Sequence, residues 1–565
     1  MASYDEEDQL KPLLQIHGRD GQQVQTPRAS RIAVVCILFC ELCERLTYYS
    51  IIANLLIFLQ NHLGFDSNSA LTGTLVFSGT VYFTPMFGGW LADSVIGRYN
   101  TLYLSGLIYA VGCALLPTVA FDYEQLGVQL DQTAARAFYI TGLVLIACGT
   151  GGIKSNVSTF GAFQVADLGQ REIQRFFTWF YWFINIGSGL AFAFVAYIQQ
   201  EVSFFAGYLI PAVSILLAIS LLLLPRPCMT HEAKPSGSPL GQLFKVMGNA
   251  ISSQSNSIYS LPSWLDYAQI SNGGRYPEDV VRGTKQVLIL IPLMLPFIGF
   301  WCIYNQMQST YLLQAERMDL SIGTFRLPAA SLSLFNSLAI ILVTPLLDLV
   351  IFPLIRRFAA VTKISLLKRI GLGFALAIVS VVIAGFLEIQ RKSELNRSGG
   401  FEQELSGRTY NASNLNILLQ IPQFFLIGTG EVFAASTGME LVYNNCPDQL
   451  KSVTMGVYLA MNGLGSYLGS LLVAIVGAAT TADPWLPEDI NTGHLEYFCF
   501  LLAGVATAFL LLFLPLSRWY DRAYQRTLMR DSDVATATYT QYGSNDENLR
   551  SSGSVTLVTG DFRKA

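Results

Sequence analysis

The sequence predicts an all-α membrane protein with twelve transmembrane helices in two bundles of six. Of its 565 residues 52% are hydrophobic and only 13% are charged, whereas soluble domains are about a quarter charged. Long apolar runs recur along the chain and reach the length of about 20 residues that a helix needs to cross a bilayer. A polar stretch over 225–285 divides these runs into two sets.

The apolar runs set the boundaries of the predicted parts. We expect a cytosolic tail over 1–31, a first bundle over 32–224, a cytosolic linker over 225–285, a second bundle over 286–516 and a disordered cytosolic tail over 517–565. Six helices, a linker and six helices is a layout that many transporters share. The twelve predicted spans are 32–59, 69–92, 101–120, 138–160, 178–199, 205–224, 286–311, 328–352, 368–388, 415–441, 452–478 and 495–516.

Basic residues predict the orientation, because cytosolic loops are enriched in lysine and arginine. The loop after the eighth span is basic, which puts both termini in the cytosol. The loop after the ninth span disagrees, since it carries Arg391, Lys392, Arg397 and Arg408. The same loop holds two glycosylation sequons, at Asn396 and Asn411, which are meaningful only on the lumenal side. A third sequon, at Asn156, falls inside the fourth span and reads as a chance match.

Several classes of protein are disfavoured. The net charge of −4 comes from nearly balanced acidic and basic residues, so nothing indicates nucleic acid. The nine cysteines and four histidines are scattered, which predicts neither a metal site nor a disulfide framework. No nucleophile–base pattern or nucleotide-binding loop indicates an enzyme. We expect no cofactor.

The first span contains an unusual charged stretch, "CELCERLTYYS". On a helix Glu41, Glu44, Arg45, Tyr48 and Tyr49 project within one arc of about 140°. A charge at the bilayer centre costs at least about 2.5–3.5 kcal/mol. These side chains are therefore expected to face an aqueous cavity. A mutually neutralised cluster that only packs helices together is the alternative.

Other predicted spans also carry polar groups. Lys154 follows a glycine-rich stretch in span four, and its alternative role is snorkelling to the interface. The remaining candidates are Tyr181 and Asn185 in span five, Trp301 and Tyr304 in span seven, Asn336 in span eight and Glu431 in span ten. An unpaired Glu431 would be costly in the bilayer, although a protonated, hydrogen-bonded structural glutamate is an alternative.

The segment "GGWLADSVIGRYN" follows the second span. Gly88 and Gly89 allow close helix packing, and Asp93, Gly97 and Arg98 form a charged hinge. The segment resembles the loop motif of the major facilitator superfamily. That resemblance implies the superfamily fold and gating contacts for Asp93 and Arg98.

Taken together, the motifs resemble the proton-dependent oligopeptide transporter family over nearly the whole chain. The family's E-x-x-E-R-F-x-Y-Y signature reads "ELCERLTYY" here, with Leu46 in place of the aromatic residue, and "GTGGIK" and "FYWFINIGS" match two further motifs. Other stretches look most like the animal peptide/histidine transporters of endosomes and lysosomes. Two departures stand out: Ile52 replaces a second arginine and Leu75 replaces a histidine of the intestinal-type members.

The resemblance implies roles for these residues. Arg45 and Lys154 would hold the carboxylate of a di- or tripeptide, or of free histidine, while Trp301 and Tyr304 would bound a side-chain pocket. Glu41 and Glu44, facing Lys154, would bind the coupling proton, together with Glu431. Protons entering from an acidic lumen would drive solute into the cytosol. Orientation of the substrate would fall to Tyr49, Tyr82 and Tyr181, and its α-amino group to Glu431, Asn185 and Asn336.

Two other functions stay open. Loss of the second arginine favours a carrier of the same fold for another amino acid or a small organic anion. A transporter-like signalling platform that recruits a cytosolic adaptor is the other alternative. The N-terminal "DEEDQLKPLL" resembles an acidic dileucine signal for the sorting machinery, which favours the endosomal or lysosomal membrane. A plain disordered acidic tail is the alternative reading of that segment.

Overall fold

A computed structural model describes residues 27–123, 131–229, 239–255, 261–351, 353, 365–405, 407–447 and 450–546. Within these ranges it describes the backbone but not the side chains of residues 27–30, 170, 239, 348–349, 452 and 524–546. The acidic N-terminal segment and the basic residues from Arg356 to Lys363 lie outside these ranges.

The N-terminal half consists of eight α-helices in the described part of the chain. Helix α7 is prolonged by π-helical turns at Ala191–Val195 and Ile198–Val202. The helices are α1 (Pro27–Ala53), α2 (Leu55–Asn61), α3 (Ser67–Phe83), α4 (Pro85–Leu91), α5 (Arg98–Ala120), α6 (Gln132–Phe163), α7 (Gln170–Leu190) and α8 (Phe204–Leu223).

The C-terminal half follows a linker that contains helix α9 (Pro239–Ser255). Its helices are α10 (Glu278–Met294), α11 (Phe297–Tyr304), α12 (Thr310–Glu316), α13 (Leu334–Leu346), α15 (Leu366–Ser398), α16 (Ile421–Glu431), α17 (Thr437–Asn444), α18 (Lys451–Ala479) and α19 (Leu495–Asp546). Since α19 continues to Asp546, the expectation of disorder from residue 517 onward is wrong for 517–546.

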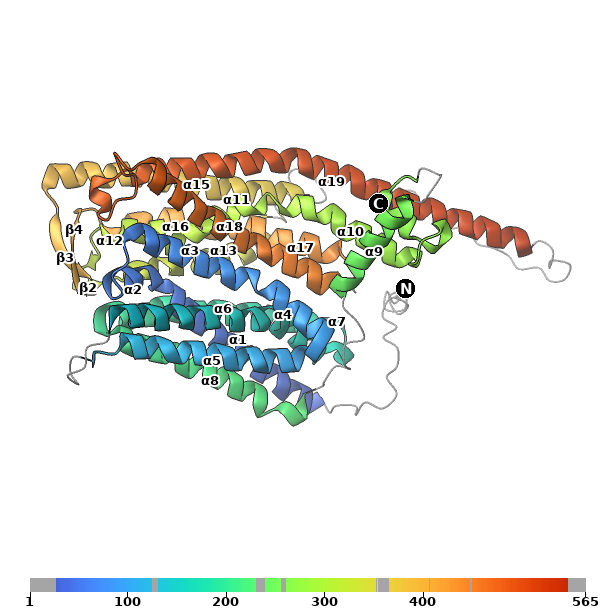
Figure 1. Ribbon diagram of the computed structural model, residues 1–565, viewed down its shortest axis with the longest axis horizontal. Helices are drawn as coiled ribbons and strands as arrows, with labels where there is room; N and C mark the ends of the chain where they lie inside the picture. Colours follow the sequence, from blue (N-terminus) through green and yellow to red (C-terminus); the bar gives the residue numbers. More distant parts are fainter. Residues whose placement is uncertain are drawn as a thin grey trace.

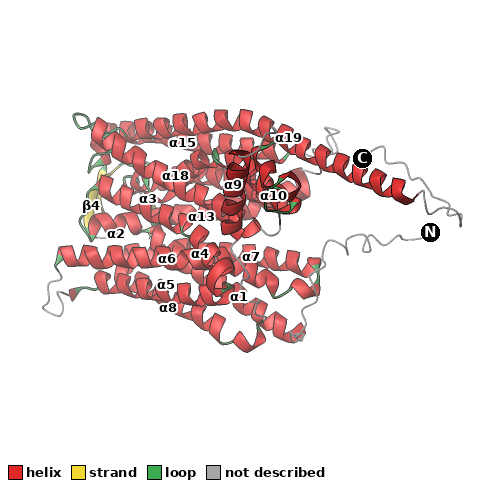
Figure 2. Ribbon diagram, turned by 45° about the vertical axis from the view of Figure 1, so that its right-hand side comes forward, coloured by secondary structure: helices red, strands yellow, loops and turns green. Residues whose placement is uncertain are grey.

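Two short antiparallel hairpins lie at one end of the molecule (Figures 1 and 2). Strands β1 (Ser321–Ile322) and β2 (Phe325–Arg326) form the first. Strands β3 (Phe401–Leu405) and β4 (Arg408–Ala412) form the second, with Phe401 opposite Ala412. We call this the hairpin end; α9 lies at the opposite end (Figure 1).

Nine described helices, and one bent pair, are long and apolar enough to cross a membrane. The bent pair joins α10 to α11–α12 with a 48° bend, at Leu295 and Pro296, where proline interrupts the backbone hydrogen bonds. The two remaining predicted spans correspond to α1–α2 and α3–α4. They depart from an uninterrupted apolar helix because Glu41, Glu44 and Arg45 interrupt the apolar part of α1 and because the chain breaks at Asn54 and Thr84.

The two halves stack side by side, as the blue-to-green and yellow-to-red layers of Figure 1. Within the first half α1 packs on α7 and α8, and α5 packs on α6; within the second, α15 packs on α16 and α19. Helix α3 packs along α18, and α7 along α13, to join the halves. The chain therefore forms the two bundles that the sequence predicts.

The basic residues that disagree with the orientation rule are all paired with carboxylates. Arg391 is fully buried in α15 and bonds Glu388 at 2.6 Å. Three of the four, Arg391, Lys392 and Arg397, lie within α15, which ends at Ser398, so they are not loop residues. The other pairs are Lys392–Glu496, Arg397–Glu394 and Arg408–Glu488.

Candidate functional site

The charged residues of α1 form one buried cluster. Arg45 Nε lies 3.0 Å from Glu41 Oε1, and Arg45 also forms an ion pair with Glu44. Glu41 lies one helical turn before Arg45 and Glu44 lies beside it, so a single guanidinium reaches both carboxylates.

Lys154, from α6, is held by aromatic rings. Its Nζ lies 3.9 Å from the centroid of the Tyr48 ring and 4.1 Å from that of Tyr82, and it makes no hydrogen bond within the described residues. The sequence predicts Glu41 and Glu44 to be the partners of Lys154, and here the structure differs. Arg45 occupies both carboxylates because it shares their helix, and the lysine stacks on the rings instead.

Glycines on neighbouring helices allow α6 to approach closely. A Cβ atom at Gly88 would lie 2.5 Å from the carbonyl oxygen of Gly151. Asn156 is buried nearby, where its Nδ2 donates to the carbonyl oxygens of Gly88 and Gly152. The sequon at Asn156 is thus inaccessible, as its position in a predicted span indicates, whereas Asn396 and Asn411 are exposed.

A cavity of about 70 Å³ lies between the halves. Six predicted residues line it: Tyr49, Tyr181, Asn185, Tyr304, Asn336 and Glu431. Asn336 Nδ2 donates to Glu431 Oε2 at 3.3 Å. Among the described residues Glu431 is the only acidic or basic side chain in the lining, so the cavity presents one carboxylate among neutral groups.

Six of the residues predicted to bind substrate or the coupling proton do not line this cavity. Trp301 is buried and packs edge-on against Tyr304, with ring centroids 4.9 Å apart. The other five, Glu41, Glu44, Arg45, Tyr82 and Lys154, belong to the charged cluster and its aromatic rings. Tyr49 connects the two regions, since it lines the cavity and its ring contacts that of Tyr48 at 5.1 Å.

The sequence left part of the lining unassigned. These residues give only a weak sequence signal, because neutral side chains are common in the packing of membrane helices. Two of them could have been found by their neighbours, since Ser188 follows Asn185 by one helical turn and Ser337 follows Asn336 directly. The unassigned lining residues are Ile184, Ser188, Phe192, Met307, Gln308, Ser333, Ser337, Ile340 and Ser436.

Contacts between the halves close the hairpin end. Tyr410 in β4 donates to Asn61 Oδ1 at 2.6 Å, and Asn61 Nδ2 donates to the Leu405 carbonyl at 3.1 Å. Glu488 accepts from Arg408 at 2.7 Å and from the backbone N–H of Ser67 at 3.1 Å. The strands β3 and β4 thereby join the first half to the second.

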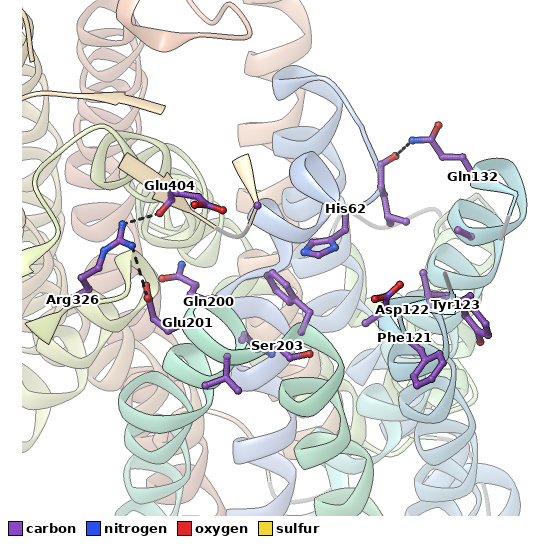
Figure 3. A pocket seen from close by; sticks show the side chains of 18 residues that line it. His62, Phe121, Asp122, Tyr123, Gln132, Gln200, Glu201, Ser203, Arg326 and Glu404 are labelled. Atoms are coloured by element: carbon purple, nitrogen blue, oxygen red, sulfur yellow. Dashed lines mark hydrogen bonds and ion pairs between the residues drawn. The ribbon is translucent and has the colours of Figure 1, made fainter. Parts of the chain in front are cut away.

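A larger polar pocket of about 900 Å³ also lies at the hairpin end (Figure 3). Arg326 lies at one side of it, donating to the Glu404 carbonyl at 2.8 Å and lying 4.0 Å from Glu201. His62 faces it from the end of α2. At the opposite end Arg98 and Asp93 form an ion pair at 3.3 Å, beside Gly97 with φ +81°.

Two helical bundles with a polar cavity between them, and a buried charged cluster beside it, define a multi-pass membrane transporter of the major facilitator fold. Comparison with known proteins identifies the family. The profile described as POT family matches residues 99–489. The chain therefore belongs to the POT family of peptide transporters; because members of this family are transporters, the prediction that it is not an enzyme is confirmed.

Relatives align over most of the chain. Solute carrier family 15 member 3 of Mus musculus is 31% identical, covering 88% of this chain and 93% of the relative. Protein NRT1/PTR FAMILY 8.3 of Arabidopsis thaliana is 33% identical, covering 83% of this chain and 88% of the relative. The crystal structure of the POT family transporter PepTSo aligns with a TM-score of 0.67 and 25% identity, covering 88% of this chain and 99% of that one.

Proposed function

We propose that this protein is a proton-coupled symporter of di- and tripeptides and free histidine. It would move them from an acidic lumen to the cytosol by alternating access. The observation that carries the proposal is the cavity between the halves, which offers Glu431 and Asn336 to an ammonium group beside a buried cluster of glutamates and cations. Membership of the POT family supports peptides as the substrate class, and the endosomal or lysosomal membrane is part of the proposal.

The proton would act on the glutamates of α1. While Glu41 and Glu44 are ionised, they hold Arg45 and keep it from a substrate carboxylate. Protonation of one glutamate weakens that pair and frees the guanidinium. Arg45 and Lys154 would then bind the carboxylate end, with Tyr49, Tyr82 and Tyr181 orienting the substrate, and Glu431, Asn185 and Asn336 would bind its amino end. Side chains of larger substrates would extend toward Tyr304 and Trp301.

The hairpin end is assigned to the lumen in this proposal. The exposed sequons at Asn396 and Asn411 lie there and would carry glycans, and both termini would be cytosolic. The contacts at the hairpin end would close the lumenal side, and the Asp93–Arg98 pair would gate the cytosolic side. The predicted boundaries at 31, 224, 285 and 516 remain part of the proposal.

Reconstituted protein tests the proposal directly. We expect a labelled dipeptide to accumulate in vesicles when a proton gradient is directed inward, and histidine to compete with it. Collapse of the gradient should abolish accumulation. Lys154→Ala and Glu44→Gln should each abolish proton-driven uptake while the protein stays folded, whereas Lys245→Ala, at an exposed position on α9, should change nothing. Absence of gradient-driven uptake of every peptide and of histidine by the wild type would overturn the proposal.

One observation favours a second candidate, a carrier of another amino acid. The cavity of about 70 Å³ suits one amino acid better than a tripeptide, and its charged lining consists, among the described residues, of Glu431 alone. A small organic anion would gain nothing from that carboxylate. Uptake of a single amino acid that no dipeptide inhibits would favour this candidate. Recruitment of an adaptor or of sorting machinery stays a prediction.

A further inference from the structure

Two buried polar side chains in the cavity have no hydrogen-bond partner within the described part of the chain. Gln308 is 8% exposed and Ser333 is 3% exposed, and both line the cavity. Gln308 ends the 3₁₀ turn between α11 and α12, and Ser333 immediately precedes α13. A carboxamide and a hydroxyl therefore face the same space with their hydrogen-bonding capacity unused.

Unused polar groups of this kind are costly unless something occupies the space beside them. A buried amide or hydroxyl without a partner loses about 1–3 kcal/mol relative to one that is hydrogen-bonded. The great majority of buried polar side chains in native proteins are consequently satisfied, by protein or by other molecules. Gln308 and Ser333 thus indicate a partner that enters the cavity.

A pair of hydroxyls continues the same surface. Ser188 on α7 and Ser337 on α13 both line the cavity, and their Oγ atoms lie 3.3 Å apart. Ser337 follows Ser333 by one helical turn. Since α7 and α13 belong to opposite halves, a ligand that bonds both hydroxyls contacts the two bundles at once.

We propose that Gln308, Ser333 and the Ser188–Ser337 pair form a subsite for a neutral hydrogen-bonding side chain of the substrate. The proposal rests on the transport function proposed above and specifies its substrate class. Hydroxyl, carboxamide and neutral imidazole side chains fit this subsite, because each can donate and accept hydrogen bonds. Aliphatic side chains do not, since they would leave Gln308 and Ser333 unpaired.

The position of the subsite identifies which side chain it binds. Ser337 adjoins Asn336, whose Nδ2 donates to Glu431. In the proposed function Glu431 receives the substrate's ammonium group. The side chain that reaches Ser333 and Ser337 is then the one next to that ammonium group, on the first residue of a peptide or on a free amino acid.

Pairs of dipeptides with the same shape test the subsite. Threonine and valine differ by a hydroxyl in place of a methyl group, so Thr-Ala and Val-Ala compete for labelled Ala-Ala under the same gradient. We expect wild-type protein to favour Thr-Ala over Val-Ala about three- to tenfold, the value of one net hydrogen bond. Gln308→Met and Ser333→Ala should each bring this ratio close to one.

Controls separate the subsite from the rest of the site. Ser220→Ala removes a hydroxyl from an exposed position on α8 and should leave the ratio as in wild type. Gln308→Asn keeps a carboxamide and should retain more selectivity than Gln308→Met. The preference for Thr-Ala over Val-Ala can be measured from residual uptake. If one of the variants Gln308→Met and Ser333→Ala does not fold, the other therefore still tests the subsite.

Three outcomes are distinct. A wild-type ratio near one, with Ala-Ala still accumulating, would overturn the subsite and leave the proposed function intact. A wild-type preference that survives in both Gln308→Met and Ser333→Ala would overturn the assignment to these residues. If no peptide and no histidine accumulates, the proposed function itself fails, and the subsite with it.

Discussion

Lys154 illustrates how a buried cation can be held without a carboxylate. Its ammonium group lies against the faces of Tyr48 and Tyr82, whose π electrons attract a positive charge. Such contacts contribute about 0.5–2 kcal/mol, depending on desolvation. They are weaker than a buried ion pair, so in the proposed mechanism Lys154 would be available to a substrate carboxylate or to a glutamate that Arg45 releases.

The aromatic contact predicts the effect of changes at Tyr48. Tyr48→Leu removes the ring, whereas Tyr48→Phe keeps it. We expect Tyr48→Phe to retain about fivefold more proton-driven uptake than Tyr48→Leu, because the attraction to Lys154 depends on the ring face. Initial uptake rates at a fixed gradient measure the difference. Equal rates for the two variants would mean that the ring does not hold the lysine.

The residues of the site could be predicted from the sequence only where they carry charge or an unusual motif. Glu431 was evident because a carboxylate in an apolar run demands an explanation. Ser333 and Gln308 were not assigned, since neutral side chains are common in membrane helices for packing reasons. The stacking of Lys154 on Tyr48 and Tyr82 was not foreseen, because spacing along one helix does not reveal which groups a neighbouring helix reaches.

At the scale of elements, the spans were predictable and their interruptions only in part. Apolar runs locate each crossing. Pro85 accounts for the break at Thr84, since proline disfavours a continuous helix through the residue before it, whereas nothing in the sequence marks the break at Asn54. The strands β3 and β4 lie in a segment that the sequence indicates only as a loop. Gly407 has φ +80° beside their turn, a conformation that glycine adopts without strain. The hairpin becomes informative only when its contacts with Asn61 and Ser67 are known.

Those contacts predict that β4 stabilises the closed hairpin end. Tyr410→Phe removes the hydrogen bond to Asn61 and should raise the population open at that end about three- to tenfold. Spin labels at the exposed positions Asp131 and Asp483, one in each half, report the opening as a longer distance.

A control for this experiment comes from the other end of the molecule. Arg175→Ala removes an exposed ion pair with Glu172 and should leave the distance distribution unchanged. If Tyr410→Phe and Arg175→Ala give the same distribution as wild type, the hairpin does not determine closure.

The start of α3 predicts a pH dependence. Burial alone would raise the pKa of Asp66, but hydrogen bonds from Ser69 outweigh it and hold the pKa below its ordinary value of 3.8. Because the pKa of Asp66 is lower in the folded state than in the unfolded state, its ionised form stabilises the folded state at pH values above the unfolded pKa. This stabilisation is lost as the pH falls through the folded pKa. The cap therefore persists at moderately acidic pH.

Substitution at Asp66 tests the direction of this pH dependence of stability. Asparagine caps helices about as well as aspartate, so Asp66→Asn should match wild type at neutral pH and lose less thermal stability between neutral pH and about pH 3. Asp66→Ala should be destabilised at neutral pH by about 1 kcal/mol. Thermal unfolding in detergent measures both. A larger acid loss in Asp66→Asn than in wild type would contradict the assignment.

At the scale of the whole molecule, the proposed alternating access would require the halves to move along α3 and α18. These helices cross closely: a Cβ atom at Gly463 would lie 2.6 Å from the carbonyl oxygen of Gly79 and 3.1 Å from the backbone nitrogen of Phe83. Both neighbours are backbone atoms, which cannot turn away as a side chain does. The glycine therefore permits the distance between the halves that the closed hairpin end requires.

Gly463→Ala is accordingly expected to disfavour this conformation. Overpacking costs about 1–3 kcal/mol, so uptake should fall about fivefold or more, and the labels at Asp131 and Asp483 should report altered spacing between the halves. Gly504→Ala is the matched control, because no atom lies within 4 Å of its added Cβ on α19. Replacing glycine in a helix by alanine also stabilises the helix by about 1 kcal/mol, so the control carries that gain without the clash. Wild-type uptake and spacing in Gly463→Ala would mean that the halves do not depend on this contact, and that transport proceeds by movement at α7 and α13 instead.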